Sequence, residues 1–294
     1  MSGLEFPERP AGAPERAPGS DRPWSGWWAL PIAIGAVVTA TVVYLIAAAI
    51  HDKIIDTPVH QPGTVGVALH GVPPVLTFLS TVAQGLALVG GSILAAGAAL
   101  KSRLTAAHFG LRPARPFSSA AFVVAGYVTF ILISALWLSA TGIKDRENIP
   151  IQLGTRDSTA ALILAATLTC VVAPICEELF FRGFLFGALR KHGLIVALLV
   201  SGAAFGLAHV ASAPIGFIVP LGTLGVILAL LYEKTGSLYP SMGLHALNNS
   251  IAFGVGDGRG WLVPVCLVAA AAAVFGVSRA AGGRQGWRTV VPNP

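Results

Sequence analysis

The sequence is poor in charged residues. Only 11% of its 294 residues are Asp, Glu, Lys or Arg, whereas 54% are hydrophobic and the mean hydropathy is +0.75. Soluble domains carry about 25% charged residues. The composition therefore excludes an ordinary soluble enzyme and predicts a membrane protein whose first partner is the lipid bilayer.

Cysteine is scarce as well. The three cysteines, Cys170, Cys176 and Cys266, all lie in apolar stretches, and the chain has no CxxC pair. This argues against a disulfide framework. We interpret the three thiols as small hydrophobic side chains within the membrane.

The net charge of +6 does not come from a basic patch, because Lys and Arg are scattered between the apolar stretches. The sequence therefore predicts no nucleic-acid partner. If the chain crosses the membrane eight times, thirteen basic residues fall on the side of the N-terminus and five on the other. The positive-inside rule then predicts that both termini are cytoplasmic.

Apolar stretches long enough, or nearly long enough, to cross a bilayer recur along the chain. A helix needs ~20 residues to span the hydrocarbon core. The sequence predicts an all-α polytopic transmembrane bundle with about eight spans, near 27–50, 74–100, 119–142, 159–190, 194–210, 214–231, 239–253 and 261–277. We expect a disordered tail at 1–24, the bundle at 25–277 and a second tail at 278–294.

Few polar side chains fall deep within these spans. They are Glu177, Glu178, Arg182, His209, His245, Asn248 and Asn249. A charged residue at the centre of a membrane helix costs at least ~2.5–3.5 kcal/mol on insertion scales, so such residues are candidates for function.

Helix geometry separates the two carboxylates. Glu178 and Arg182 are four residues apart and can pair on one face, whereas Glu177 points ~100° away from Glu178. Pro174 removes a backbone hydrogen bond and can open space beside Glu177. The spacing therefore predicts a structural pair, Glu178 with Arg182, and leaves Glu177 free for chemistry.

The remaining polar residues repeat the spacing of four. Phe205 and His209 share one face of the fifth span, and His245 and Asn249 share one face of the seventh. Glycines four apart, at 183 and 187 and at 202 and 206, would allow close approach of the fourth and fifth spans, although ordinary packing is the more common explanation of such pairs.

These groups together suit hydrolysis of a peptide bond. Glu177 and His209 could activate a water molecule while His245 and Asn249 stabilise the oxyanion. Each residue taken alone has a simpler interpretation, because buried histidines are often core residues and membrane asparagines often join helices. Glu177, His209 and His245 also form the His₂Glu set of catalytic zinc sites, so the sequence leaves zinc open.

The sequence resembles the CPBP family of intramembrane endopeptidases, also called the CAAX-protease, bacteriocin-processing or Abi family, with the Rce1 type as its best-known branch. The signatures EExxxR, FxxxH and HxxxN stand here, in order, at 177–182, 205–209 and 245–249. The resemblance covers about residues 160–253 and places a catalytic core at 159–253. It implies an intramembrane protease in which Glu177 and His209 activate water and His245 and Asn249 stabilise the transition state.

The resemblance leaves several points open. Asn249 is a poor zinc ligand and a good oxyanion donor, and the chain has no HExxH motif, so we favour a glutamate-type mechanism without a metal cofactor. The expected partner is a membrane-associated protein or peptide substrate, of undetermined identity. The alternatives are a non-catalytic immunity or partner protein on the same scaffold and a transporter or proton-relay protein, which would be expected to show an internal repeat or discontinuous helices.

Overall fold

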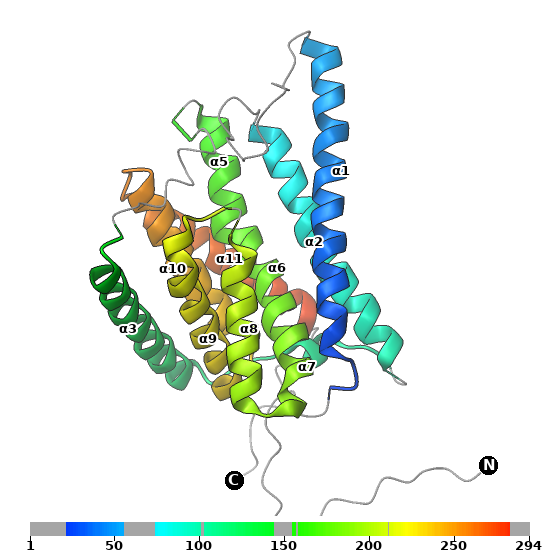
Figure 1. Cartoon of the computed structure of the whole chain (residues 1–294), viewed down its shortest axis with the longest axis vertical. Helices are drawn as coiled ribbons and strands as arrows, with labels where there is room; N and C mark the ends of the chain where they lie inside the picture. The colour runs from blue at the N-terminus through cyan, green and yellow to red at the C-terminus, as the bar shows by residue number, and fades with distance from the viewer. Residues whose placement is uncertain are drawn as a thin grey trace, which may run out of the picture.

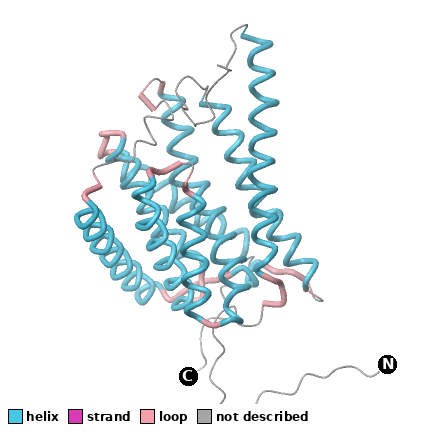
Figure 2. The backbone as a smooth tube through the Cα atoms, viewed as in Figure 1, coloured by secondary structure: helices cyan, strands magenta, loops and turns pink. Residues whose placement is uncertain are grey.

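The computed structural model describes residues 22–55, 74–100, 103–143, 155–156, 158–210 and 212–282, and within these ranges every regular element is helical (Figure 2). Eight helical rods follow one another, as the hydropathy predicts. They are α1 (Ala29–Ile55), α2 (Pro74–Ala99), α3 (Pro116–Thr141), a composite fourth rod from α5 (Thr159–Thr167) through α6 (Ala173–Glu178) to α7 (Gly187–Leu189), then α8 (Leu194–Ala208), α9 (Ile218–Thr235), α10 (Leu238–Gly256) and α11 (Leu262–Gly282).

The predicted tails fall largely outside the described residues. Two boundaries differ from the prediction. Trp24, expected in a disordered tail, is packed with only 1% of its surface exposed. Helix α11 continues to Gly282 instead of ending at residue 277.

The surface of the bundle is apolar and its interior contains charge. Large side chains such as Leu94, Leu136 and Val268 are more than two-thirds exposed, whereas Glu178 and Arg182 are fully buried. Six of the helical rods are long and apolar enough to cross a membrane. This pattern is that of a multi-pass integral membrane protein.

Helix α8 is the shortest of the rods. Its 15 residues extend about 22 Å at the helical rise, less than the ~30 Å hydrocarbon core. If Leu194 lies at the membrane surface, His209 at the other end of α8 lies within the hydrocarbon core.

The central helices are flanked on both sides (Figure 1). Helices α8, α9 and α10 and the fourth rod contact one another, α1 packs with α2 on one side, and α3 packs against α9 on the other. Helix α11 lies along α10. The three signatures are thus carried by helices in the middle of the bundle.

The fourth rod is not a regular α-helix. The segments η3 (Leu168–Val172) and η4 (Leu179–Phe186) are π-helical and enclose α6. Pro174 at the start of α6 has no amide hydrogen with which to continue the α-helical register, which accounts for the irregularity on its N-terminal side. The two adjacent carboxylates therefore lie on a short α-helical turn between two wider ones.

Close packing by glycine joins α8 to α9, not α8 to the fourth rod as predicted. A Cβ atom at Gly206 would lie 2.6 Å from the Ile218 carbonyl oxygen, and one at Gly202 would lie 2.4 Å from Val226. The glycines of α8 do permit a close approach, but the helix they meet is α9, so the predicted pairing with the fourth rod was wrong. The spacing of small residues shows which face of a helix permits close packing. It does not show which neighbouring helix packs there.

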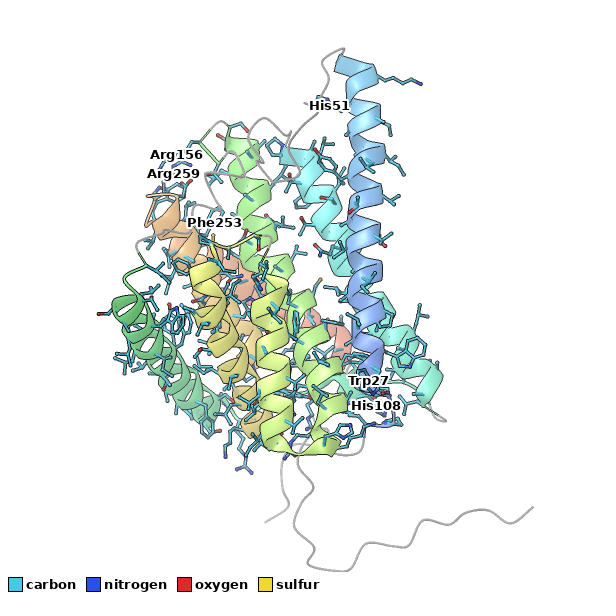
Figure 3. The ribbon with its side chains drawn as sticks, in the orientation of Figure 1. Trp27, His51, His108, Arg156, Phe253 and Arg259 are labelled. Carbon is cyan, nitrogen blue, oxygen red and sulfur yellow. The ribbon has the colours of Figure 1, made fainter. Side chains whose placement is uncertain are left out.

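Basic residues gather at one end of the bundle, which we call the basic end. It holds the start of α1, the α2–α3 connection, the α7–α8 and α9–α10 turns and the end of α11. At the opposite end Asp257, 2% exposed, accepts a hydrogen bond from the Thr155 hydroxyl and pairs with Arg259 at 3.3 Å, with Arg156 close by (Figure 3). Successive connections between the helices lie at opposite ends of the bundle, as the predicted spans require. Which side of the membrane each end faces stays a prediction.

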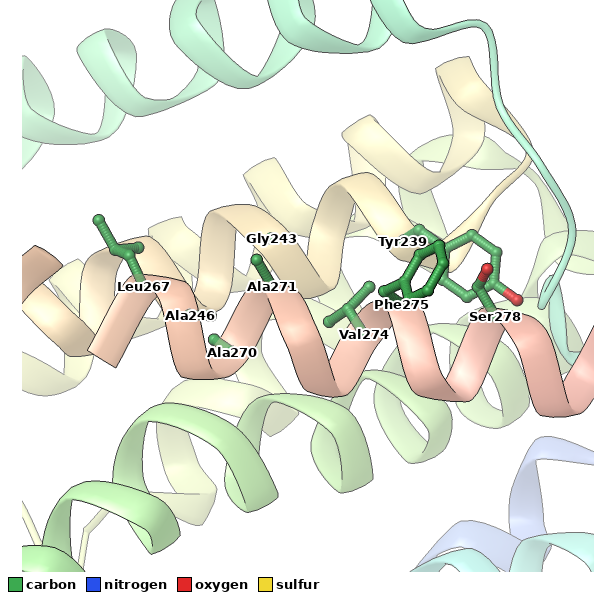
Figure 4. Close-up of a pocket in the computed structure, with 9 residues that line it drawn as sticks. All are labelled: Tyr239, Gly243, Ala246, Leu267, Ala270, Ala271, Val274, Phe275 and Ser278. Carbon is green, nitrogen blue, oxygen red and sulfur yellow. The ribbon is translucent and has the colours of Figure 1, made fainter. Parts of the chain in front are cut away.

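An apolar cavity of about 410 Å³ lies between α10 and α11 (Figure 4). Its lining contains no charged side chain, and its polar groups are the hydroxyls of Tyr239 and Ser278. It is therefore separate from the polar side chains of the three signatures.

Candidate active site

The pair expected from the first signature is present. Glu178 Oε1 lies 2.9 Å from Arg182 Nη1, and both side chains are fully buried. The Arg182 guanidinium also donates a hydrogen bond to the Gly225 carbonyl of α9 at 3.0 Å and lies 4.5 Å from the centre of the Phe205 ring. Because a carboxylate, a carbonyl and an aromatic face surround it, the positive charge is compensated inside the bundle.

His245 lies between the two carboxylates. Its Nδ1 is 3.1 Å from Glu178 Oε1, and its Nε2 is 3.9 Å from Glu177 Oε2. An ionised carboxylate can only accept, so Nδ1 carries the hydrogen in this contact. Glu178 therefore fixes the orientation of His245, a role that the spacing of the first signature did not indicate.

His209 approaches Glu177 from the end of α8. Its Nε2 is 3.9 Å from Glu177 Oε2, and its Nδ1 is 2.8 Å from the Phe205 carbonyl oxygen. The carbonyl can only accept, so Nδ1 is the donor here too. His209 terminates the helix in a turn conformation instead of continuing it, which directs the ring toward α6.

Phe205 joins the three signatures. Its fully buried ring lies 4.8 Å from the His209 ring and 5.3 Å from the His245 ring, measured between centroids. Together with the Arg182 contact, this places Phe205 against all three polar groups. Phe205, the first residue of the FxxxH signature, therefore supports the site by packing against these side chains, as expected.

Asn249 lies one helical turn beyond His245 on α10. Its amide nitrogen donates a 2.9 Å hydrogen bond to the Thr169 carbonyl in the π-helical segment η3, and its oxygen lies 3.4 Å from the Asn248 amide nitrogen. A side-chain amide has two N–H groups. One of them donates to Thr169, and none of the described residues accepts from the other.

Glu177 is the one carboxylate of the group without a hydrogen bond. Its Oε2 atom is buried and unpartnered within the described part of the chain, while 22% of its side chain is exposed. Three groups, Glu177 Oε2 and the Nε2 atoms of the two histidines, therefore face a common point from three different helices.

These three groups do not have the spacing of a zinc site. In a tetrahedral site with bonds of ~2.0–2.1 Å, ligand atoms lie about 3.3–3.4 Å apart, and Glu177 Oε2 is 3.9 Å from each imidazole nitrogen. Among the described residues, no group of three or more His, Cys, Asp or Glu side chains is arranged to hold a metal ion. The His₂Glu chemistry is suitable, but in this structure its geometry does not fit zinc.

The fold and these residues define a class: a multi-pass helical membrane protein with a carboxylate and two imidazoles that converge within the bundle. Residues 159–251 match the family model described as Type II CAAX prenyl endopeptidase Rce1-like. The resemblance carried by the three signatures is confirmed, and residues 159–251 form the Rce1-like part of the chain.

Relatives with similar sequences come from two bacteria. YyaK of Bacillus subtilis (strain 168), an uncharacterised protein, is 38% identical over 96 residues, which are 30% of this chain and 32% of YyaK. YdiL of the same strain, named as a candidate membrane peptidase, is 30% identical over 95 residues, or 32% of this chain and 38% of YdiL. An uncharacterised protein of Mycoplasma capricolum is 26% identical over 139 residues, or 46% of this chain and 41% of that protein.

The chain thus spans about a third to two-fifths of the length of the curated relatives it matches. No solved structure is significantly similar to it.

Proposed function

We propose that this protein is an intramembrane endopeptidase that hydrolyses a peptide bond of a membrane-associated protein or peptide. The observation that carries the proposal is the convergence of Glu177 Oε2 with the Nε2 atoms of His209 and His245, each 3.9 Å away. The similarity of residues 159–251 to a family of CAAX prenyl endopeptidases supports it.

The hydrogen-bond partners of the histidines determine what each can do. With Nδ1–H donated to the Phe205 carbonyl, neutral His209 presents the Nε2 lone pair. His245 donates its Nδ1–H to Glu178, so its Nε2 can act as a second donor only when the ring is protonated. Glu177 Oε2 and His209 Nε2 are therefore the two acceptors to which a water molecule can donate its two hydrogens.

The reaction follows from these roles. Glu177 and His209 accept a hydrogen bond each from the water and take one proton as its oxygen attacks the carbonyl carbon of the scissile bond. His245, in its protonated form, and the free N–H of Asn249 donate to the oxyanion that develops. The tetrahedral intermediate then expels the amine, which receives the proton held by the Glu177–His209 pair, and a carboxylic acid and an amine are released.

Glu178 and Arg182 hold this arrangement without taking part in proton transfer. Glu178 accepts from Nδ1 of His245 and so orients the ring, whose Nε2 faces Glu177. We propose that the reaction uses no metal cofactor and that both termini lie in the cytoplasm.

The test is a comparison of membrane proteomes from cells that produce the wild-type protein or Glu177→Gln at equal levels. We expect at least one membrane protein to lose a terminal fragment in the variant and to regain it when the wild-type gene is restored. Identical fragments in both cells, with the protein present and folded, would contradict the proposal and favour the partner-protein or proton-relay alternatives.

A further inference from the structure

The basic end contains one described carboxylate, and that carboxylate is already paired. Glu233 accepts hydrogen bonds from Arg190 through both of its oxygens, at 2.7 to 3.0 Å. None of the described carboxylates lies within ion-pair distance of Arg22 or Arg112. These two guanidinium groups are therefore charges without a described counter-charge.

Arg22 is held against the bundle by neutral groups. Its Nη2 donates a 3.1 Å hydrogen bond to the Tyr232 hydroxyl, and its guanidinium lies 5.2 Å from the centre of the Trp24 ring. Trp24 in turn donates from Nε1 to the Phe184 carbonyl at 3.1 Å and stacks on the rings of Phe109 and Phe184. The arginine is thus fixed in position by a buried anchor, although no anion balances it.

Arg112 is fixed beside the same tyrosine. Its Nε donates to the Gly236 carbonyl, and its own carbonyl accepts a 2.6 Å hydrogen bond from the Ser237 hydroxyl. Two residues earlier, Gly110 has a φ of +82° and lies so close to Tyr232 that a Cβ atom would be 2.7 Å from the hydroxyl. Arg22 and Arg112 are therefore anchored at the same end of α9, Arg22 at the Tyr232 hydroxyl and Arg112 at the Gly236 carbonyl.

The two charges affect one another. Burial lowers the pKa of the Arg22 guanidinium, its contacts with Tyr232 raise it, and the charge of Arg112 lowers it again. An anion near the two guanidinium groups would offset their mutual repulsion. The two charges therefore favour the binding of an anion.

We propose that Arg22 and Arg112 bind the phosphate of an anionic phospholipid at the membrane surface. Trp27 and Trp28, which begin the first span, are 88% and 55% exposed. Exposed tryptophans at the end of a span mark the level of the lipid headgroups. Arg22 precedes these tryptophans by a few residues at the same end of the bundle, and basic sites between membrane helices are suited to anionic lipid headgroups.

The proposal can be tested on the purified full-length protein by titration with phosphatidylglycerol or phosphatidylcholine in nanodiscs or by native mass spectrometry. We expect phosphatidylglycerol to bind more tightly. Arg112→Gln should weaken its binding about five-fold, as loss of one basic contact implies, and Arg112→Lys should largely restore it. Glutamine keeps an N–H that can donate to Gly236, so the fold should be retained. Arg22→Gln should weaken binding to a similar extent.

Arg115→Gln is the matched control, because Arg115 is exposed at the same end and its side chain has no described partner. It should change binding by less than two-fold. Equal loss in Arg115→Gln and Arg112→Gln, or equal binding of both lipids, would overturn the proposal. Displacement of the lipid by millimolar inorganic phosphate would overturn the lipid assignment in favour of free phosphate, and lipid binding that appears only after removal of residues 1–20 would overturn it in favour of the N-terminal segment as occupant.

Discussion

Substitution by Gln should have different effects at the two adjacent carboxylates: at Glu178 it should lower stability, and at Glu177 it should abolish activity. In Glu178→Gln, the buried Arg182 loses its one carboxylate partner and retains only the Gly225 carbonyl and the face of Phe205. Removing one partner of a buried ion pair costs about 3–5 kcal/mol. The ratio of folded to unfolded protein should fall by about 10²- to 10⁴-fold.

Glu177→Gln is the matched control. The Glu177 carboxylate makes no hydrogen bond in the described structure and is 22% exposed, so its loss should change the free energy of unfolding by about 1 kcal/mol or less. This variant should fold normally and be inactive. The assay is equilibrium unfolding in mixed micelles of increasing SDS content, followed by tryptophan fluorescence, alongside peptidase activity.

A double variant tests whether the instability of Glu178→Gln comes from the unpaired charge of Arg182 or from changed side-chain packing. In Glu178→Gln with Arg182→Met, both buried charges are removed, and we expect at least about 2 kcal/mol of the lost stability to return. Glutamine can still accept from His245 through its amide oxygen. The reasoning would be refuted if Glu178→Gln were as stable as the wild type and yet inactive, because the two carboxylates would then have exchanged roles.

Two further predictions concern the cofactor and the packing. Asn249→Ala should lower kcat by ~10²–10³ with little change in KM. The purified wild-type enzyme should carry no stoichiometric metal. A content of about one zinc per chain, lost together with activity in His209→Ala, would overturn the metal-free mechanism. Gly206→Ala should destabilise the protein by about 1–3 kcal/mol and reduce activity, because its methyl group would press on the Ile218 carbonyl and displace the end of α8 that carries His209. Gly243→Ala is its control: a Cβ there meets nothing within 4 Å, so thermal unfolding should show no loss of stability.

The sequence by itself determined the class of protein and the positions of its helices. Hydropathy and span length are local properties, and the described helices agree with the predicted spans within a few residues at most boundaries. The i, i+4 spacing also predicted the ion pair of Glu178 with Arg182, because both residues lie on one helix and need no knowledge of its neighbours.

The tertiary structure decided which faces meet. Spacing along one helix could not show that Glu178 also holds His245, that the Thr169 carbonyl engages Asn249, or that the glycines of α8 face α9. It gave no sign that Trp24 is buried beneath the bundle. A helical sequence defines its own faces, but the rotation of each helix and the neighbour it faces depend on the packing of all the helices together, and that is a property of the whole chain.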